Sequence, residues 1–447
     1  VKIAEIIPGG PAFKAKTLEV NDRIVAVAQG KDGEFVDVIG WRLDVTVTKI
    51  KGPKGTIVRL KVIPAGEELS ATPKIVELVR DKVVLEDQSA KRTIKTVTQD
   101  GKSYKIGIIQ IPAFYADFKA MQARDPNYKS TTRDVKLLLD TLKRENVDAV
   151  VIDLRSNGGG SLPEAISLSG LFIKSGPIVQ VRDRRNNVEI EEDEDPGIAW
   201  TGPLGVLQDR FSASASEIFA GAIQDYGRGI IIGNQSYGKG TVQQGIDMGR
   251  VIGTADKLML KAAQTAGNKS GAVISSNAPE FGQINLTMAK FYRVNGSTTQ
   301  HKGVVPDIEL PTVFPKDKYG ESSEPRALPW DTIAPSKYSL VANLEDVKRK
   351  LLSLHKERMK TSLGYQNLQQ DIAEFAKREA ETTITLNEVQ LKKERDEQEA
   401  KVLLRENQRR AAKGLPPLKK GEARPKDDVD FIRDEGLQIM ADYISNK

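Results

Sequence analysis

Apolar runs of strand length alternate with amphipathic segments through the middle of the chain. The run AVVIDL (149–154) is too apolar for a strand that faces water on one side, and RGIIIG (228–233) has a similar character. Before the first run, Val135, Leu138, Leu139 and Leu142 recur at helical spacing. Apolar strands beside such helices are buried on both faces of a sheet. The pattern therefore predicts an α/β core.

Short strands and tight turns fill residues 1–66. The sequence gives KIAEII (2–7), then PGGPA, then NDRIVAVAQG (21–30), a helix in GWRLDVTVTKIKG (40–52) and a strand in GTIVRLKVI (55–63). This order resembles a PDZ domain, which pairs a peptide C-terminus between an edge strand and a helix. The first strands and carboxylate-binding loop of such a domain would precede Val1. With no initiating Met and no signal segment, we interpret the chain as a fragment or a processed form.

Two further patterns concern the flanks of the core. Alternation around an RNN turn predicts a hairpin over 178–197, and its carboxylate run 191–195 lacks the alternate-residue spacing of a calcium loop, which favours a solvated loop. Beyond about residue 315 the chain becomes rich in charged helical segments, including one in which Tyr365, Leu368, Ile372 and Phe375 share a face. The basic, proline-containing tract 409–426 suits a solvated connector, or contact with an acidic surface.

Composition narrows the class of protein. Of the 447 residues, 29% are charged and 39% hydrophobic, and no apolar run approaches the roughly 20 residues of a membrane helix. The net charge of +6 is spread through interspersed lysines and glutamates, which argues against a nucleic-acid footprint. The sequence has no cysteine and therefore excludes disulfides and thiolate catalysis. Its two histidines, His301 and His355, leave a Ser-His-Asp scheme open, although neither lies near a nucleophile motif.

The stretch FSASASEIF (211–219) places three serines before a predicted helix. Ser214 and Glu217 have the S-x-x-E spacing of a capping box, which is a purely structural interpretation. Alanines around Ser214 also let a substrate backbone approach, and a helix start supplies free N–H groups for an oxyanion hole. The stretch thus fits either a helix cap or a nucleophile.

The stretch GNQSYGKGTVQ (233–243) raises the same kind of choice for Lys239. It nearly matches the P-loop pattern G-x-x-x-x-G-K-[ST], but Gly240 follows the lysine where magnesium needs a hydroxyl, and TVQQG appears extended. As a general base, Lys239 would need its pKa of about 10.4 lowered by about three units through burial. Gln243, four positions on, is expected on the same side as Lys239 and could orient the amine.

Taken together, residues 211–243 resemble the catalytic core of the C-terminal processing peptidases, in particular the bacterial tail-specific proteases. The DLRSNGGG turn, the HKGVVPDI segment, the PDZ-like start and the charged C-terminal region extend the resemblance over nearly the whole chain. The most specific element is the 25-residue separation of Ser214 from Lys239, with Gln243 at the fourth position after the lysine.

The resemblance implies a role for each residue of the motif. Ser214 would be the nucleophile, Lys239 the general base and Gln243 the residue that orients the lysine. The oxyanion donors would be the backbone N–H of Ala215 and of a glycine in 157–160, most simply Gly159. The residues with supporting roles would be Ser212, Ser216, Glu217, Gly158 and Gly160. The reaction would be acyl transfer, with no metal, nucleotide or other cofactor.

The implied fold is an α/β peptidase core of the ClpP/crotonase type at 67–315, with an N-terminally incomplete PDZ domain at 1–66 and a helical C-terminal domain at 316–447. The resemblance also implies a bacterial periplasmic location, polypeptide substrates with nonpolar C-termini, and an outer-membrane lipoprotein adaptor with helical repeats as a partner. A PDZ scaffold that has lost catalysis is the alternative without enzymatic activity.

Overall fold

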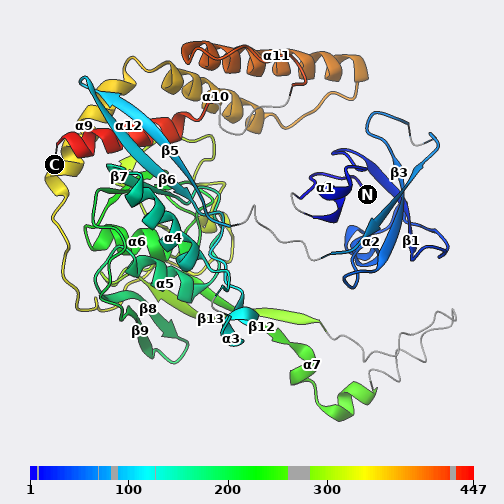
Figure 1. Ribbon diagram of the computed structural model, residues 1–447, viewed down its shortest axis with the longest axis horizontal. Coiled ribbons are helices and arrows are strands. Elements are labelled where there is room, and N and C mark those ends of the chain that lie inside the picture. Colours follow the sequence, from blue (N-terminus) through cyan, green and yellow to red (C-terminus); the bar gives the residue numbers. More distant parts are fainter. Residues whose placement is uncertain are drawn as a thin grey trace. The chain divides into compact units, whose positions relative to one another are not determined.

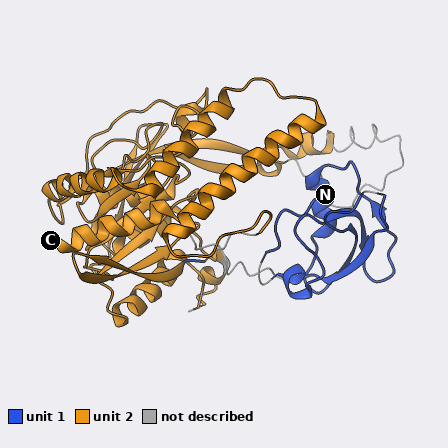
Figure 2. Ribbon diagram, turned by 90° about the horizontal axis from the view of Figure 1, so that it is seen from above, with its two compact units in different colours: residues 1–90 blue, residues 91–447 orange. Residues whose placement is uncertain are grey.

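The computed structural model describes residues 1–7, 10–68, 70–81, 89–125, 127–259, 282–422 and 429–446. The chain divides into two compact units, residues 1–90 and residues 91–447, which Figure 2 colours separately. Among the described residues, no helix combines the length and the apolar character that a membrane span requires.

The first unit is built on an antiparallel sheet with the strand order β2-β1-β3-β4. Figure 1 labels strands β1 and β3 of this unit. Val27, Leu60 and Val62 belong to the apolar cluster that fills this unit. Its elements are α1 (Pro11–Ala15), β1 (Arg23–Gln29), β2 (Val36–Asp37), α2 (Leu43–Ile50), β3 (Ile57–Ile63) and β4 (Lys74–Val79). From β1 onward, the predicted strand and helix positions are confirmed.

Two features of the first unit differ from the sequence-based expectations. The segment KIAEII makes only an isolated bridge, between Lys2 and Arg23. From Ala26 on, β2 and β3 occupy both edges of β1, so this segment can pair only at the start of that strand. The unit also continues to residue 90, beyond the expected boundary at residue 66, because β4 completes the sheet along β3.

The described residues of the second unit form a sheet of six strands in the order β14-β11-β10-β7-β6-β5. The strands from β14 to β6 run parallel, and β5 is antiparallel to β6. Every residue of β7 and β10 is buried, as predicted for AVVIDL. The strands are β5 (Lys91–Gln99), β6 (Lys102–Gln110), β7 (Ala149–Asp153), β10 (Leu204–Gln208), β11 (Ile230–Gly233) and β14 (Ile308–Glu309).

Helices cover both faces of this sheet. An added Cβ at Gly107 of β6 would lie 2.7 Å from a Leu142 methyl of α4, and one at Gly205 of β10 would lie 2.6 Å from Met440 Sδ of α12. These glycines pair with successive residues of β7, so they point to opposite faces. The helices of the α4 layer are α4 (Thr131–Arg144), α5 (Leu162–Gly170) and α6 (Ala215–Asp225), and those of the other layer are α9 (Glu345–Met359) and α12 (Phe431–Ser445).

A second sheet of this unit has the order β12-β13-β8-β9. β8 (Gly176–Asp183) and β9 (Val188–Asp193) form the predicted hairpin, and the Asp183 carboxylate accepts the Arg185 and Asn187 N–H groups in its turn. The other elements here are α3 (Phe118–Gln122), β12 (Thr241–Asp247), α7 (Met248–Val251) and β13 (Gln283–Tyr292). β12 begins two residues after Lys239, so this sheet continues directly from the candidate lysine.

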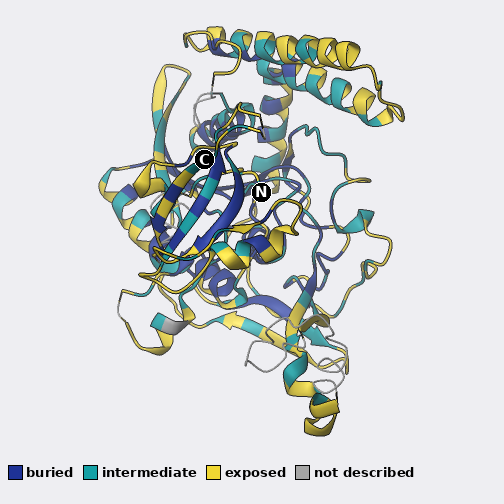
Figure 3. Ribbon diagram, turned by 90° about the vertical axis from the view of Figure 1, so that its right-hand side faces the viewer, coloured by how far each residue is buried: buried dark blue, intermediate teal, exposed yellow. Residues whose placement is uncertain are grey.

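Beyond residue 315 lie η2 (Glu321–Ser323), α9, α10 (Leu363–Ala380), α11 (Glu388–Ala412) and α12. The pair α10–α11 is largely exposed (Figure 3), whereas Leu437 and Met440 of α12 enter the core cluster. The region therefore shares its core with the main sheet in one compact unit. In the basic tract, Leu418 exchanges hydrogen bonds with the Asn407 amide at 2.7 and 3.0 Å, which folds the connector back on α11; residues 423–426 lie outside the described part.

Candidate active site

Ser214 stands at the junction between strand β10 and helix α6. It is the N-cap of α6, with φ 56° and ψ −112°, a conformation that costs a non-glycine residue about 1–3 kcal/mol. Ala213 and Ala215 are buried, whereas Ser214 is only partly buried. The strained turn thus makes Ser214 the most accessible residue of the three.

The glycine-rich turn after β7 (residues 156–160, the glycine turn) packs directly against this serine. A Cβ at Gly159, where φ is +103°, would lie 2.8 Å from both Ser214 Cβ and Ala213 O. Asn157 O accepts the Ala213 N–H at 2.9 Å and the Ser216 hydroxyl at 2.9 Å. Only glycine fits at position 159, because the two turns touch through their backbones.

The amides around Ser214 differ in whether they are already bonded. Within the described residues, the N–H groups of Ala215, Gly158 and Gly160 make no hydrogen bond, and Ala215 is the first residue of α6. The Gly159 N–H donates to Asn157 Oδ1 at 2.9 Å. The Ala215 amide is therefore available to an oxyanion, whereas the Gly159 amide would first have to leave Asn157.

The fully buried Glu217 carboxylate binds both the Ser214 backbone and the loop that carries Lys239 (residues 234–240, the lysine loop). Glu217 Oε2 accepts the Ser214 N–H at 2.8 Å and the Lys239 N–H at 2.9 Å, so those nitrogens lie at most 5.7 Å apart, the sum of the two distances. Glu217 Oε1 accepts the Ser236 hydroxyl at 2.6 Å and the Gly238 N–H at 2.6 Å. The predicted return of Glu217 to the Ser214 backbone is present, and the same side chain also fixes the lysine loop.

The surroundings of Glu217 set its ionisation. Burial raises the pKa of Glu217 to about 7, while the hydrogen bonds from Ser236, Gly238, Ser214 and Lys239 act in the opposite direction. All four of these partners are donors, so the hydrogen-bond pattern matches the ionised carboxylate. The hydrogen bonds that link the two loops are therefore strongest when Glu217 is charged.

The segment 298–304 supports the lysine loop from its other side. Gln300 Oε1 accepts the Gly240 N–H at 2.8 Å, and the His301 N–H donates to Gly238 O at 2.7 Å. The Val304 N–H donates to Ser236 Oγ at 2.7 Å. The HKGVVPDI segment (301–308), which is part of the family resemblance, thus lies against the loop that carries Lys239.

The structure does not join the side chains of Ser214, Lys239 and Gln243 by hydrogen bonds. Lys239 is partly buried, and among the described residues its amine has no hydrogen-bond or ion-pair partner. Gln243 is exposed on β12, opposite Thr287 of β13. Lys239 is less enclosed than its sequence predicts, because the loop is held through its backbone amides rather than its side chain.

The P-loop interpretation of residues 233–243 is wrong. The residues after Lys239 form strand β12, so no helix N-terminus follows the lysine to bind a phosphate. The N–H groups of Gly238 and Lys239 point to the Glu217 carboxylate. A loop whose amides already bind a buried anion cannot cradle another.

The two histidines occupy different environments. His355 is buried in α9, with Nδ1 2.8 Å from Glu435 Oε1, so it belongs to the packing of α9 on α12. His301 is exposed, although its backbone lies beside Gly238.

Within the described residues, no group of three or more His, Asp or Glu side chains could hold a metal ion.

The serines that flank Ser214 connect its turn to the end of β7. Ser212 Oγ donates to Leu154 O at 2.8 Å and accepts the Asp209 N–H at 2.9 Å, and Ser216 Oγ binds Asn157 O. Asp209 and Arg155, which hold the glycine turn from either side, are not among the site residues predicted from the sequence. Both follow buried parallel strands whose carboxyl ends meet at one edge, and this is the signal that could have found them.

We expect Gly159→Ala to destabilise the protein by more than about 1 kcal/mol and to displace Ser214, because the new methyl meets backbone at a positive φ. Gly158→Ala is the matched control, since a Cβ there has no atom within 4 Å. Denaturant unfolding of both variants measures the difference. Equal unfolding midpoints would contradict the close contact between the two turns.

Three family models match consecutive parts of the chain. They are a PDZ domain at residues 1–63, peptidase family S41 at 105–310 and the C-terminal domain of tail specific protease at 314–445. The chain is 38% identical over 449 residues to the tail-specific protease of Haemophilus influenzae, covering 99% of this chain and 58% of the relative. It is 30% identical over 312 residues to the chloroplastic carboxyl-terminal-processing peptidase 2 of Arabidopsis thaliana, covering 70% and 50%.

The chain thus spans 58% and 50% of the lengths of these two curated relatives. Among solved structures, it is similar to a photosystem II D1 C-terminal processing protease, with 24% identity, a TM-score of 0.39 and coverage of 71% of this chain and 70% of the other. A PDZ domain of a Vibrio cholerae carboxy-terminal protease, solved in complex with a peptide, is 46% identical over 18% of this chain and 79% of its own, with a TM-score of 0.17.

Proposed function

We propose that this chain, which belongs to peptidase family S41 and carries the domains of tail-specific proteases, is a serine endopeptidase with a Ser214–Lys239 dyad. The observation that carries the proposal is the Glu217 carboxylate, which holds the Ser214 and Lys239 backbones on one oxygen. Two loops 25 residues apart in sequence are thereby kept together at the start of a helix.

The proposed reaction begins with proton transfer. The unprotonated Lys239 amine takes the Ser214 proton, and Ser214 Oγ attacks the carbonyl carbon of a peptide bond. The four rotatable bonds of the lysine side chain allow its nitrogen to approach the hydroxyl once substrate covers the site, since catalytic hydrogen bonds are often long in free enzymes. Gln243 on β12 is proposed to orient the amine.

The tetrahedral oxyanion requires backbone donors. The Ala215 N–H is unbonded within the described residues, and it begins α6, where the helix dipole favours negative charge. The second donor is proposed to come from the glycine turn, with Gly159 after release from Asn157 or its neighbours Gly158 and Gly160. Lys239 then returns the proton to the leaving amine, and water hydrolyses the acyl-enzyme with Lys239 again as base.

Substrates are proposed to be unfolded polypeptides with nonpolar C-termini, as the resemblance implies. A bacterial periplasmic location and a helical-repeat lipoprotein adaptor belong to the same proposal. The relatives named tail-specific protease and carboxyl-terminal-processing peptidase support action at the carboxyl end of polypeptides.

Incubation with an unstructured polypeptide that ends in apolar residues tests the proposal. We expect the protein to cleave it and its Ser214→Ala variant to lose activity by about 10⁴-fold or more while still binding the polypeptide. The same polypeptide with a charged C-terminus tests the substrate class separately. Binding without cleavage by the unchanged protein would instead support a PDZ scaffold without catalysis.

A further inference from the structure

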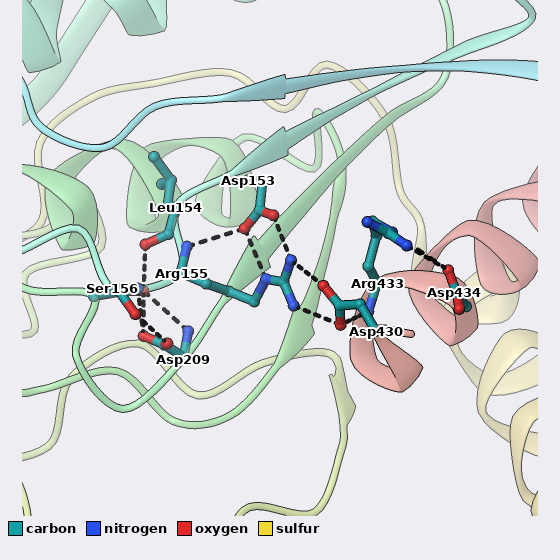
Figure 4. A network of polar contacts seen from close by, with 9 residues as sticks. Asp153, Leu154, Arg155, Ser156, Asp209, Asp430, Arg433 and Asp434 are labelled. Carbon is teal, nitrogen blue, oxygen red and sulfur yellow. Dashed lines mark hydrogen bonds and ion pairs between the residues drawn. The ribbon is translucent and has the colours of Figure 1, made fainter. Parts of the chain in front are cut away.

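The N-terminus of the last helix, α12, lies beside the glycine turn, 275 residues away in sequence (Figure 4). Asp430 is the N-cap of α12, and its Oδ1 accepts the Arg433 N–H at 2.9 Å. The Arg155 guanidinium donates to the same carboxylate from Nη1 at 2.9 Å and lies 2.8 Å from its Oδ2 through Nη2. One aspartate therefore caps the helix and binds the residue that precedes the glycine turn.

The forked Arg155 guanidinium also binds Asp153, the last residue of β7. Arg155 Nε and Nη2 donate to the two Asp153 oxygens at 2.9 and 2.6 Å. The Arg155 side chain is 21% exposed and that of Asp153 6%. Burial alone would lower the pKa of Arg155, but Asp153 and then Asp430 raise it above its ordinary value. A planar guanidinium held on both sides by carboxylates has little freedom to turn.

A chain of short contacts leads from Arg155 to Ser214. Ser156 adopts φ +60°, and its N–H and hydroxyl bind the Asp209 carboxylate at 2.9 and 3.3 Å. Asp209 also accepts the Phe211 N–H at 2.9 Å, three residues before Ser214. A non-glycine residue at positive φ persists only where its surroundings hold it. Ser156 is held in this conformation by Arg155 on one side and by Asp209 on the other.

The Arg155–Asp430 pair is not what docks α12 on the sheet. Leu437, Ile439, Met440 and Tyr443 of α12 belong to the core cluster, and the first three are at most 3% exposed. This apolar burial keeps the helix in place without the ion pair. The Arg155–Asp430 pair instead fixes the position of the α12 N-terminus relative to the glycine turn.

We propose that Arg155 and Asp430 are positioning residues through which α12 holds the glycine turn in the conformation that the reaction at Ser214 requires. The proposal rests on the proposed function. It assigns the C-terminal region a part in catalysis. Among the described residues, no hydrogen bond or ion pair joins α12 to Ser214 or to the lysine loop, whereas Asp430 at its N-terminus binds Arg155, next to the turn that supplies the oxyanion donors.

Asp430→Asn tests the proposal, because asparagine is as good an N-cap as aspartate but loses the charge that holds Arg155. We expect kcat for polypeptide cleavage to fall about tenfold with KM unchanged, a size typical of residues that act through others. Asp434→Asn is the matched control. Asp434 lies one turn further along α12, pairs with Lys413 and Arg433, and is expected to leave kcat unchanged.

A double-mutant cycle separates positioning from general stability. Arg155→Lys keeps the charge but loses the fork, so it should lower kcat alone and have a clearly smaller effect in the Asp430→Asn background than in the wild-type protein. All variants are compared well below their unfolding temperatures. An Asp430→Asn variant with a lowered Tm but wild-type kcat would overturn the proposal, as would additive effects in the cycle. If the unchanged protein neither cleaves polypeptide nor reacts with a serine-directed acylating reagent, the proposed function itself fails.

Discussion

Replacement of Lys239 by alanine is expected to lower kcat for polypeptide cleavage by about 10⁴-fold or more, with little change in folding stability. The proposed reaction has no other base at Ser214. Stability should be preserved because, among the described residues, the lysine loop is held through the Lys239 N–H, which alanine retains, while the amine binds no partner. Steady-state kinetics and denaturant unfolding of the same preparation measure the two quantities.

His301→Asn is the matched control for Lys239→Ala. His301 is exposed and lies beside Gly238, so it is the residue that a Ser-His scheme would use. Asparagine tolerates its φ of +68° and keeps the backbone hydrogen bond to Gly238. We expect near wild-type kcat. A large loss in His301→Asn together with activity in Lys239→Ala would assign the base to the histidine.

The Glu217→Gln variant is expected to have the second largest effect, a fall in kcat of about 10²-fold at pH 8. Each Glu217 oxygen accepts two donors, so an amide nitrogen at either position would face N–H or O–H groups that then lack an acceptor. Lost hydrogen bonds to a charged group cost about 1.5–3 kcal/mol each. The Ser214 and Lys239 loops would therefore move apart, and kinetics with unfolding measurements at pH 8 test this.

Glu164→Gln is the control for this substitution. Glu164 has the same position in helix α5 that Glu217 has in α6, is buried, and accepts the Thr132 N–H at 2.8 Å. Its replacement should cost stability without changing kcat. A similar loss of kcat in both variants would show that Glu217 acts only through general stability.

The pH dependence of stability follows from the raised pKa of Glu217. Burial places this pKa at about 7 in the folded state, above the ordinary value of 4.5. The protonated Glu217 therefore makes its full contribution to the free energy of unfolding below pH 4.5, and this contribution is lost as the pH rises through about 7. Relative to Glu217→Gln, we expect the wild-type protein to lose on the order of 3 kcal/mol between pH 4 and pH 8. Parallel pH profiles of the two proteins would refute the assignment.

The alignment of the Ser214 and Lys239 loops should improve with rising pH, opposite to the trend in folding stability. The four donors around Glu217 bind a charged carboxylate more strongly than a neutral one, so we expect the hydrogen bonds that join Ser214 and Lys239 to strengthen as the pH rises through about 7. The protein thus gives up stability in the pH range where the candidate site is best ordered. This is the expected cost of burying a charge to hold two loops together.

Local sequence patterns determined the elements and the candidate chemistry of this protein. The apolar run 149–154 became the fully buried strand β7, and Ser214 is the N-cap of helix α6, because burial and helix capping depend on residues close in sequence. The segment TVQQG formed a strand, as its sequence indicates. The family resemblance of residues 211–243 was likewise visible without a structure.

Only the tertiary structure decided how these pieces are held. Glu217 binds Lys239 across 22 residues, and Arg155 binds Asp430 across 275, and no local pattern records such partners. The same is true of Gly159, whose requirement for glycine comes from contact with Ser214. Periodicity reports what one segment buries, whereas the partner of a buried charge depends on which distant segments the fold brings together.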